Sequence, residues 1–194
     1  MYMLCGDGVG RSCDCVSRIP VFGRFLFSRL NRLVLAQSSV GDEGAVALGE
    51  ALKSNNTLET LKLHNNLIGG AGAQSLADML QVNRALISAN LGYNSIGDEG
   101  TTSLSEALKS NSTLEELKLV RNEIGAAGAQ SLANMLQFNR ALNSVDLRFN
   151  QIPIQGEEQL RDAVKNKNIT LNSVDLLNQR LRDEVKDKNI TLIL

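Results

Sequence analysis

The sequence predicts a curved α/β solenoid, with a parallel sheet along its inner side and helices along its outer side. Three observations predict it: a period of 28 residues, an alternating apolar and polar run that opens each period, and helical spacing of apolar residues in its second half. Modules of this kind bury their apolar faces only by stacking on one another. The copies open at Leu30, Leu58, Leu86, Leu114 and Leu142, with a shortened sixth at Leu171.

Each copy is expected to form a strand, a turn, a helix and a second turn, as residues 58–85 illustrate. Leu61 and Leu63 alternate with polar residues at the period of a half-buried strand. A glycine-rich turn follows Asn66, and apolar residues at helical spacing come next. The helix should end at Asn83, because asparagine tolerates the left-handed conformation that ends helices. A helix is wider than a strand, so stacked units bend towards their strands.

The copies alternate between two kinds. Residues 39–86 and residues 95–142 are identical at most positions, which indicates that a block of two units was duplicated. One kind carries the string GDEG, and the other carries GAQSLA. The differences between the blocks gather on the outward side of the strand and on one helix, whereas nearly every core leucine is unchanged.

The strings LKLHNNLIGGAGAQSLADML and LKLVRNEIGAAGAQSLANML resemble leucine-rich repeats of the ribonuclease-inhibitor class, which also alternates two kinds of unit. That class includes ribonuclease inhibitor, the C-terminal arrays of NOD-like receptors and the GTPase-activating protein for Ran. The resemblance implies a horseshoe segment with a concave parallel sheet and convex helices. We therefore expect a leucine-rich-repeat domain of about six repeats over residues 29–194, preceded by an irregular tail or cap over residues 1–28.

Composition favours a cytoplasmic protein without a cofactor. The formal net charge of -1 gives no strong field to attract nucleic acid or an acidic membrane surface. No stretch approaches the roughly 20 apolar residues of a membrane span. Three cysteines, at Cys5, Cys13 and Cys15, suit a reducing compartment better than a disulfide framework. We expect no metal site and no nucleic-acid, membrane or small-molecule partner.

No group of residues indicates an enzyme. His64 is the sole imidazole, and its counterpart in the sister block is Val120. Asp42 and Asp98, each followed by a glutamate, fall at predicted helix starts, where negative charge favours the positive end of the helix dipole. Glycine pairs recur in successive units, which favours tight turns and close helix packing over a phosphate-binding loop.

One asparagine follows the strand in most units. Its expected role is structural, because an amide can bind the backbone of adjoining loops where neither strand nor helix supplies a partner. A polar track for a ligand is the functional alternative. The column consists of Asn66, Asn94, Asn122 and Asn150, and the first unit has Ser38 in their place.

The outward side of the strands is the candidate binding surface. Strand side chains alternate, so the third, fifth and seventh positions of a unit point away from the core, and the eighth lies beside them. Tyr93, Arg121 and Phe149 share the eighth position and are of the types that anchor protein interfaces. The candidate residues are Lys62, His64, Asn90, Tyr93, Glu116, Lys118, Arg121, Asp146, Arg148 and Phe149. In the sixth copy the same four positions fall on Ser173, Asp175, Leu177 and Asn178.

Together with the resemblance, this surface predicts a non-catalytic module that binds a protein partner through the concave face. The resemblance also leaves two alternatives. One is a GTPase activator of the Ran activator type, with Arg121 or Asn65 orienting groups at the partner's nucleotide. The other is a leucine-rich-repeat fragment of a NOD-like innate immune receptor. An inhibitor of a basic nuclease would favour a strongly acidic concave face, whereas this face is mixed.

Overall fold

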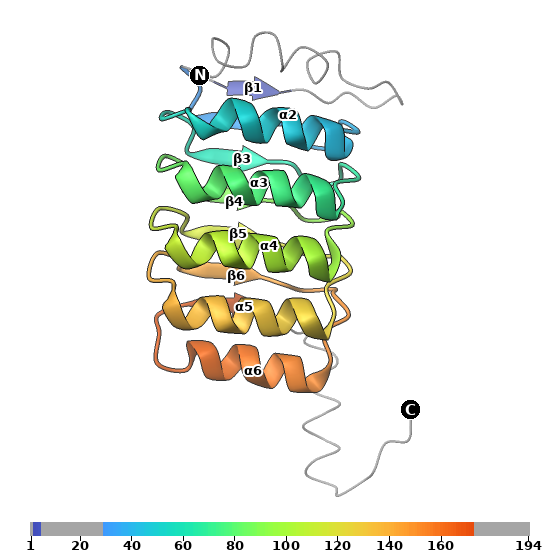
Figure 1. Ribbon diagram of the computed structural model, residues 1–194, viewed down its shortest axis with the longest axis vertical. Helices are drawn as coiled ribbons and strands as arrows, with labels where there is room; N and C mark the ends of the chain where they lie inside the picture. The colour runs from blue at the N-terminus through green and yellow to red at the C-terminus, as the bar shows by residue number, and fades with distance from the viewer. Residues whose placement is uncertain (1, 5–28, 173–194) are drawn as a thin grey trace, which may run out of the picture.

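A computed structural model describes residues 2–4 and 29–172 of the chain. In this part, parallel strands form a single sheet in chain order, and helices alternate with them along one side (Figure 1). The strands are β1 (Tyr2–Leu4), β2 (Arg32–Val34), β3 (Thr60–Lys62), β4 (Ser88–Asn90), β5 (Glu116–Lys118), β6 (Ser144–Asp146) and β7 (Thr170–Asn172). The helices are α2 (Gly41–Lys53), α3 (Gly70–Val82), α4 (Gly97–Ser110), α5 (Ala126–Phe138) and α6 (Ile154–Val164).

The strands pair in phase with the repeat. Arg32 pairs with Thr60, Thr60 with Ser88 and Ser88 with Glu116, so equivalent positions of successive units lie side by side. This register confirms the predicted α/β solenoid. Neighbouring strands lie about 4.8 Å apart, whereas packed helices need about 8–10 Å, so the sheet lies on the concave side.

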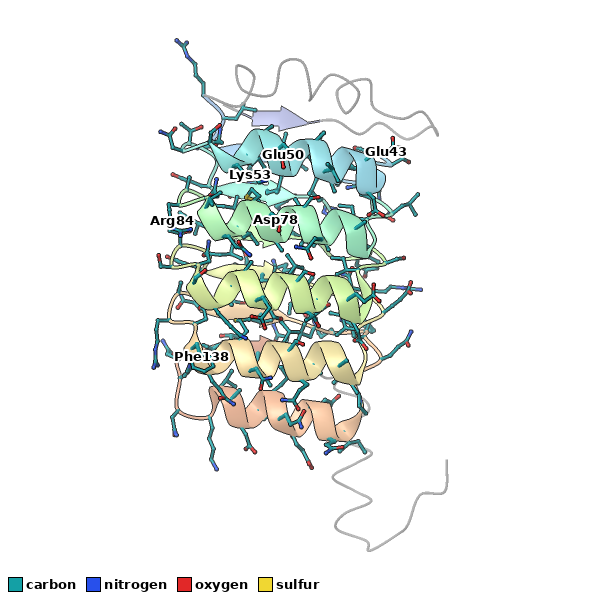
Figure 2. All side chains as sticks on the ribbon, in the orientation of Figure 1. Glu43, Glu50, Lys53, Asp78, Arg84 and Phe138 are labelled. Atoms are coloured by element: carbon teal, nitrogen blue, oxygen red, sulfur yellow. The ribbon has the colours of Figure 1, made fainter. Side chains whose placement is uncertain are left out.

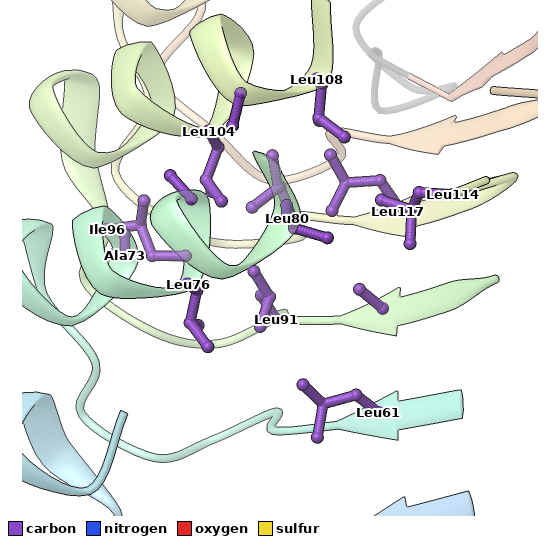
Figure 3. Close-up of a cluster of buried hydrophobic side chains, with 14 of the residues drawn as sticks. Leu61, Ala73, Leu76, Leu80, Leu91, Ile96, Leu104, Leu108, Leu114 and Leu117 are labelled. Carbon is purple, nitrogen blue, oxygen red and sulfur yellow. The ribbon is translucent and has the colours of Figure 1, made fainter. Parts of the chain in front are cut away.

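The core is a continuous layer of aliphatic side chains between the sheet and the helices. Leu61 from β3 and Leu76 and Leu80 from α3 are buried and point towards one another (Figure 3). Leu91 and Leu117, from the next two units, extend the same layer. Burying one such leucine side chain contributes about 1.5–3 kcal/mol. Because the layer runs through every unit, each unit depends on its neighbours to exclude water.

Glycine allows the helices to approach one another closely. A Cβ atom placed on Gly72 would lie 2.6 Å from Oδ1 of Asp42 and 2.9 Å from Cβ of Ala45, both in the preceding helix. A Cβ on Gly100 would lie 2.8 Å from Cβ of Ala73. The recurring glycines therefore serve helix packing, as the sequence predicted.

The asparagine column has the structural role expected for it. Oδ1 of Asn94 accepts the N–H groups of Asn66 and Ile68, each at 3.0 Å. Its Nδ2 donates to the carbonyl oxygens of Leu63 and Leu91 at 3.0 and 2.8 Å. One side chain thus ties its own strand end to the loop of the preceding unit. The other three asparagines of the column also bond to the unit before them.

A second column of asparagines lies at the helix ends. The expected left-handed conformation of Asn83 was wrong, since its φ and ψ are -67° and 136°. Its Nδ2 instead donates to the carbonyl oxygens of Leu52 and Asn55 in the preceding unit, each at 2.9 Å. Its Oδ1 accepts the N–H groups of Ala85 and Leu86. An extended backbone lets the amide bridge two units, which a purely local helix stop cannot do. The column consists of Asn83, Asn111 and Asn139.

The acidic residues at the helix starts cap the next helix along the chain. Asp42 lies in the first turn of α2, as predicted. Its Oδ1 accepts the N–H groups of Gly69 and Gly72 at 2.7 and 2.9 Å, where α3 begins. Asp98 of α4 makes the same two bonds to the start of α5. Neither α3 nor α5 has an acidic residue in its own first turn. Units with the string GDEG therefore cap the helices of the units with the string GAQSLA that follow them.

The last repeat differs from the register that the sequence predicted. Thr170, and not Ser173, pairs with Ser144. Leu171 is therefore the residue of the last repeat that is equivalent to Val145 of the core layer. The cause is a shorter helix: α6 has 11 residues where α5 has 13. Ser173, which the prediction placed in the third-position column, lies outside the described residues, as do the other sixth-copy candidates.

At the opposite end, the short strand β1 pairs in parallel with β2. The sequence did not predict this strand, because residues 1–28 match no repeat. An open sheet edge exposes unpaired N–H and C=O groups, and β1 satisfies those of β2. The rest of the expected tail or cap, residues 5–28, lies outside the described residues.

Replacing Asp98 with alanine should destabilise the array, because the N–H groups of Gly125 and Gly128 lose their acceptor. We expect the free energy of unfolding to fall by about 0.5–2 kcal/mol, the range for loss of a helix cap. Thermal unfolding monitored by circular dichroism measures the effect. Glu99→Ala, an exposed neighbour in the same helical turn, is the control. Equal stabilities for the two variants would show that the cross-unit cap contributes nothing.

Candidate functional site

Seven of the candidate residues lie on the outward side of β3 to β6 or directly after these strands. We call this set the strand face. Most of these side chains are half-buried, whereas Asp146 is buried and Arg148 is exposed. The strand face consists of Lys62, His64, Asn90, Glu116, Lys118, Asp146 and Arg148.

The charges of the strand face largely neutralise one another. Nζ of Lys118 lies 2.9 Å from Oε1 of Glu116, and the hydroxyl of Ser88 donates to Oε2 of Glu116 at 2.6 Å. The Ser88 hydrogen bond, together with Lys118, lowers the pKa of Glu116 below its usual value. Nε and Nη2 of Arg148 donate to the two oxygens of Asp146 at 2.9 and 2.7 Å. A partner that contacts these side chains must share or replace these bonds.

His64 is half-buried on the strand face. Burial, and then the neighbouring charge of Lys62, lowers the pKa of His64, so the imidazole is neutral at neutral pH. Its buried Nδ1 has no hydrogen-bond partner within the described part of the chain. This environment suits a neutral contact side chain better than a general base, which would need a neighbouring acid to orient it.

The three remaining candidates meet at the edge where the strands end and the helices begin. Tyr93, Arg121 and Phe149 line a groove of about 450 Å³ across four consecutive units. In Figure 2 this edge is the one on which Glu43 is labelled, whereas Arg84 and Phe138 mark the opposite edge. We call it the edge groove. Its lining residues are Asn65, Leu67, Tyr93, Asn94, Ser95, Arg121, Glu123, Phe149 and Gln151.

The three large residues of the edge groove have a left-handed backbone. The φ angles of Tyr93, Arg121 and Phe149 are 58°, 52° and 61°. Asn65 occupies the same position of its unit with a φ of 61°, and asparagine is among the residues that tolerate this region best. For other side chains the left-handed region costs roughly 1–2 kcal/mol per residue. The sequence thus carries bulky side chains at a position where the backbone disfavours them.

The edge groove combines polar side chains with exposed apolar ones and has one cation beside its rings. The exposed fractions are 75% for Leu67, 57% for Phe149 and 49% for Tyr93. The guanidinium carbon of Arg121 lies 5.9 Å from the centre of the Tyr93 ring, within the range of a cation–π contact. Glu123, also at the groove, accepts a hydrogen bond from Ser95 at 3.1 Å.

Sequence reasoning missed Leu67 as a candidate. The signal was present, because a leucine stands there at a loop position where other units have serine, glutamate or glutamine. Sequence reasoning also missed Glu123, which lines the same groove as Arg121. The two parts of the predicted set, the strand face and the eighth-position residues, are adjacent but differ in chemistry.

Within residues 2–4 and 29–172, no group of three or more His, Cys, Asp or Glu side chains could hold a metal ion. Over the same residues, no helix has both the length and the apolar character needed to cross a membrane. Cys5, Cys13 and Cys15 lie outside the described residues.

Comparison with known proteins identifies the repeat. Residues 54–77, 83–105 and 110–133 each match a family model described as Leucine Rich repeat. The chain is similar to a solved structure of leiomodin-1 actin-binding site 2, with 20% identity, a TM-score of 0.61, and coverage of 90% of this chain and 94% of that one. It is also similar to the tropomodulin C-terminal domain of Caenorhabditis elegans, with 19% identity, a TM-score of 0.62, and coverage of 87% and 98%.

No curated protein sequence matches this chain. At identities of 19% and 20%, the likeness to the two solved structures shows the fold alone. The matched segments are therefore leucine-rich repeats, joined in tandem as strand-and-helix units, in agreement with the resemblance to the ribonuclease-inhibitor class.

Proposed function

We propose that this chain is a non-catalytic module that binds a protein partner through its concave side. The edge groove supplies the main contacts, and the strand face surrounds them. The observation that carries the proposal is the exposure of Tyr93, Arg121 and Phe149 at left-handed backbone positions. Residues that the surrounding structure holds in sparsely populated conformations cluster at functional sites, where the strain is part of the function.

The scaffold does not account for these side chains. None of the three belongs to the buried core, and an asparagine at the same position would impose less strain. Tyrosine and arginine are enriched among the residues that dominate binding energy at protein interfaces. A contact with a partner would bury the exposed apolar surface of Leu67 and Phe149, which are otherwise in water.

The strand face contributes selectivity more than affinity in this proposal. Its Glu116–Lys118 and Arg148–Asp146 pairs already satisfy one another, so a partner gains little net energy there. A partner with a poorly matched charge pattern would disrupt these ion pairs, and that disruption would make its binding free energy less favourable. The strand face spans the four strands β3 to β6, or about 15 Å at about 4.8 Å per strand, which is enough to contact part of a protein epitope.

Actin is a reasonable first protein to test, because leiomodin-1, a structural neighbour, is described by an actin-binding site. A GTPase activator of the Ran activator type would use the same edge, with Arg121 as the residue that reaches the nucleotide. Cosedimentation with actin and a turnover assay on a panel of small GTPases examine these two assignments directly.

Replacing Tyr93 and Arg121 together with alanine should weaken binding to the cognate protein at least tenfold, or about 1.4 kcal/mol, because the ring and the cation are lost. Proteins captured from the source cell by the wild-type chain are identified by mass spectrometry, and their affinities are then measured with purified partner. Gln37→Ala is the matched control, since Gln37 is exposed and has a left-handed φ of 55° but does not line the groove. Wild-type affinity in the double variant would reject the edge groove as the binding site.

Replacing Tyr93 with asparagine should separate binding from folding. We expect the free energy of unfolding to stay constant or to rise by up to about 1–2 kcal/mol, because asparagine tolerates the left-handed backbone. Binding should weaken, because the ring is removed. Thermal unfolding and affinity are measured on the same preparation. A clear loss of stability would instead make Tyr93 part of the scaffold.

A further inference from the structure

We infer that the edge groove recognises an extended protein segment that presents a carboxylate beside an apolar side chain. This inference rests on the proposed function and specifies the chemistry of its partner. The carboxylate binds the Arg121 guanidinium, and the apolar side chain lies against Leu67, Tyr93 and Phe149.

Arg121 is not paired with a carboxylate in the described part of the chain. Within residues 2–4 and 29–172, its guanidinium takes part in no ion pair or hydrogen bond, and its guanidinium carbon lies 5.9 Å from the centre of the Tyr93 ring. The arginine of the adjacent unit, Arg148, is held by both oxygens of Asp146. Two neighbouring arginines are thus in opposite states, one neutralised within the chain and one available to a partner.

The contact with Tyr93 leaves the N–H donors of Arg121 without a hydrogen bond within residues 2–4 and 29–172. A guanidinium carries five N–H donors in a fixed planar fork, and these donors point outward in its plane. A carboxylate can therefore bind in bidentate fashion without displacing the ring. Tyr93 then acts as a positioning residue that orients the donors and reduces the ordering cost of binding.

The acid at the groove does not neutralise Arg121. Glu123 accepts a hydrogen bond from the Ser95 hydroxyl at 3.1 Å and forms no ion pair within the described residues. Glu116, on the strand that precedes Arg121, is paired with Lys118 at 2.9 Å. The cation of the groove is therefore the group left to bind an incoming charge.

The dimensions of the groove set the length of the segment. It spans four units, from Asn65 to Phe149, and strands about 4.8 Å apart make this about 15 Å. An extended chain rises about 3.3 Å per residue, so about five residues cross the groove. The carboxylate and the apolar side chain must therefore lie within a few residues of each other.

A protein segment fits this groove better than an anionic membrane does. The groove is lined by one cation, Arg121, and one anion, Glu123, so it presents no net positive charge. Binding to acidic lipid is driven by clusters of basic residues. Arg121-dependent binding to acidic lipid would therefore contradict the inference.

The test is selection of a random linear-peptide display library on the full chain, with counter-selection on the Arg121→Ala variant. We expect the enriched peptides to contain Asp or Glu close to an aromatic or aliphatic residue. Replacing that acid with its amide should weaken binding to the wild-type chain about tenfold, as loss of a charge-assisted hydrogen-bonded pair does, and should have no further effect on Arg121→Ala.

Two conservative variants examine the geometry. Arg121→Lys keeps the charge but lacks the planar fork, so we expect about tenfold weaker peptide binding. Tyr93→Phe keeps the ring face and should bind as the wild type does. Thermal unfolding of both variants shows whether each is folded, and Gln37→Ala serves as the unaffected control.

Several outcomes would overturn the inference. The first is enrichment of peptides that contain no Asp or Glu. The second is an acid-to-amide change that weakens binding equally to the wild-type chain and to Arg121→Ala. The third is that no peptide binds the wild-type chain more tightly than it binds Arg121→Ala. Arg121-dependent sedimentation with vesicles of phosphatidylcholine and phosphatidylserine would assign the groove to a membrane instead. If capture of a protein partner still requires Tyr93 and Arg121 while the peptide result is negative, the proposed function stands and the acidic segment is wrong.

Discussion

Each unit of this chain satisfies its buried backbone groups through the neighbouring unit, and the rest of the structure depends on that constraint. One asparagine column joins the strand ends and another joins the helix ends, so successive units are tied together on both sides of the core. Asn94 bonds the loop that holds Asn66 and Ile68, and Asn83 bonds the carbonyl groups that end α2. The amides fix one register, and in that register equivalent residues of successive units lie side by side.

The edge groove is a consequence of the same register. The eighth position of a unit follows the strand and precedes the asparagine, where the backbone is left-handed. Neither the core nor the amide column constrains that side chain. Tyr93, Arg121 and Phe149 are far apart in the sequence, but in-phase stacking places them along one edge. Residues that are one period apart in the sequence therefore form a contiguous surface. The side chains at the eighth position of each unit determine the chemistry of that surface.

The sequence predicted the solenoid because period, alternation and helical spacing agree in every unit. It also predicted the role of Asn66 and its equivalents, since a polar residue recurring at a strand end must satisfy backbone groups. It did not predict the extended conformation of Asn83 or the partners of Asp98. Both depend on which atoms of the next unit lie within reach, and a one-dimensional pattern does not record that. The register of β7 was also missed, because the shortening of α6 lies within a helix whose sequence shows no break.

For the candidate surface, the sequence brought out residue types but not their electrostatic state. Arg121 and Arg148 look equivalent in the printed sequence, since each follows a strand by two or three residues. In the structure, Arg148 is bound by Asp146, whereas Arg121 lies over a tyrosine ring and pairs with no carboxylate of the described residues. The exposure of Leu67 was likewise open to sequence reasoning, but its position beside the groove was not. The difference between a neutralised and an available cation arises from side-chain geometry, and the proposed partner chemistry rests on it.

The most direct measurement of the central claim is amide hydrogen exchange in the Asn94→Ala variant. If the units satisfy one another's backbone, the N–H groups of Asn66 and Ile68 should lose protection, because Oδ1 of Asn94 is their acceptor. The N–H groups of Asn122 and Ile124 should keep their protection, because they are bonded to Asn150, which lies two units from Asn94. Unchanged protection of Asn66 and Ile68, or an equal loss at all four amides, would contradict the account.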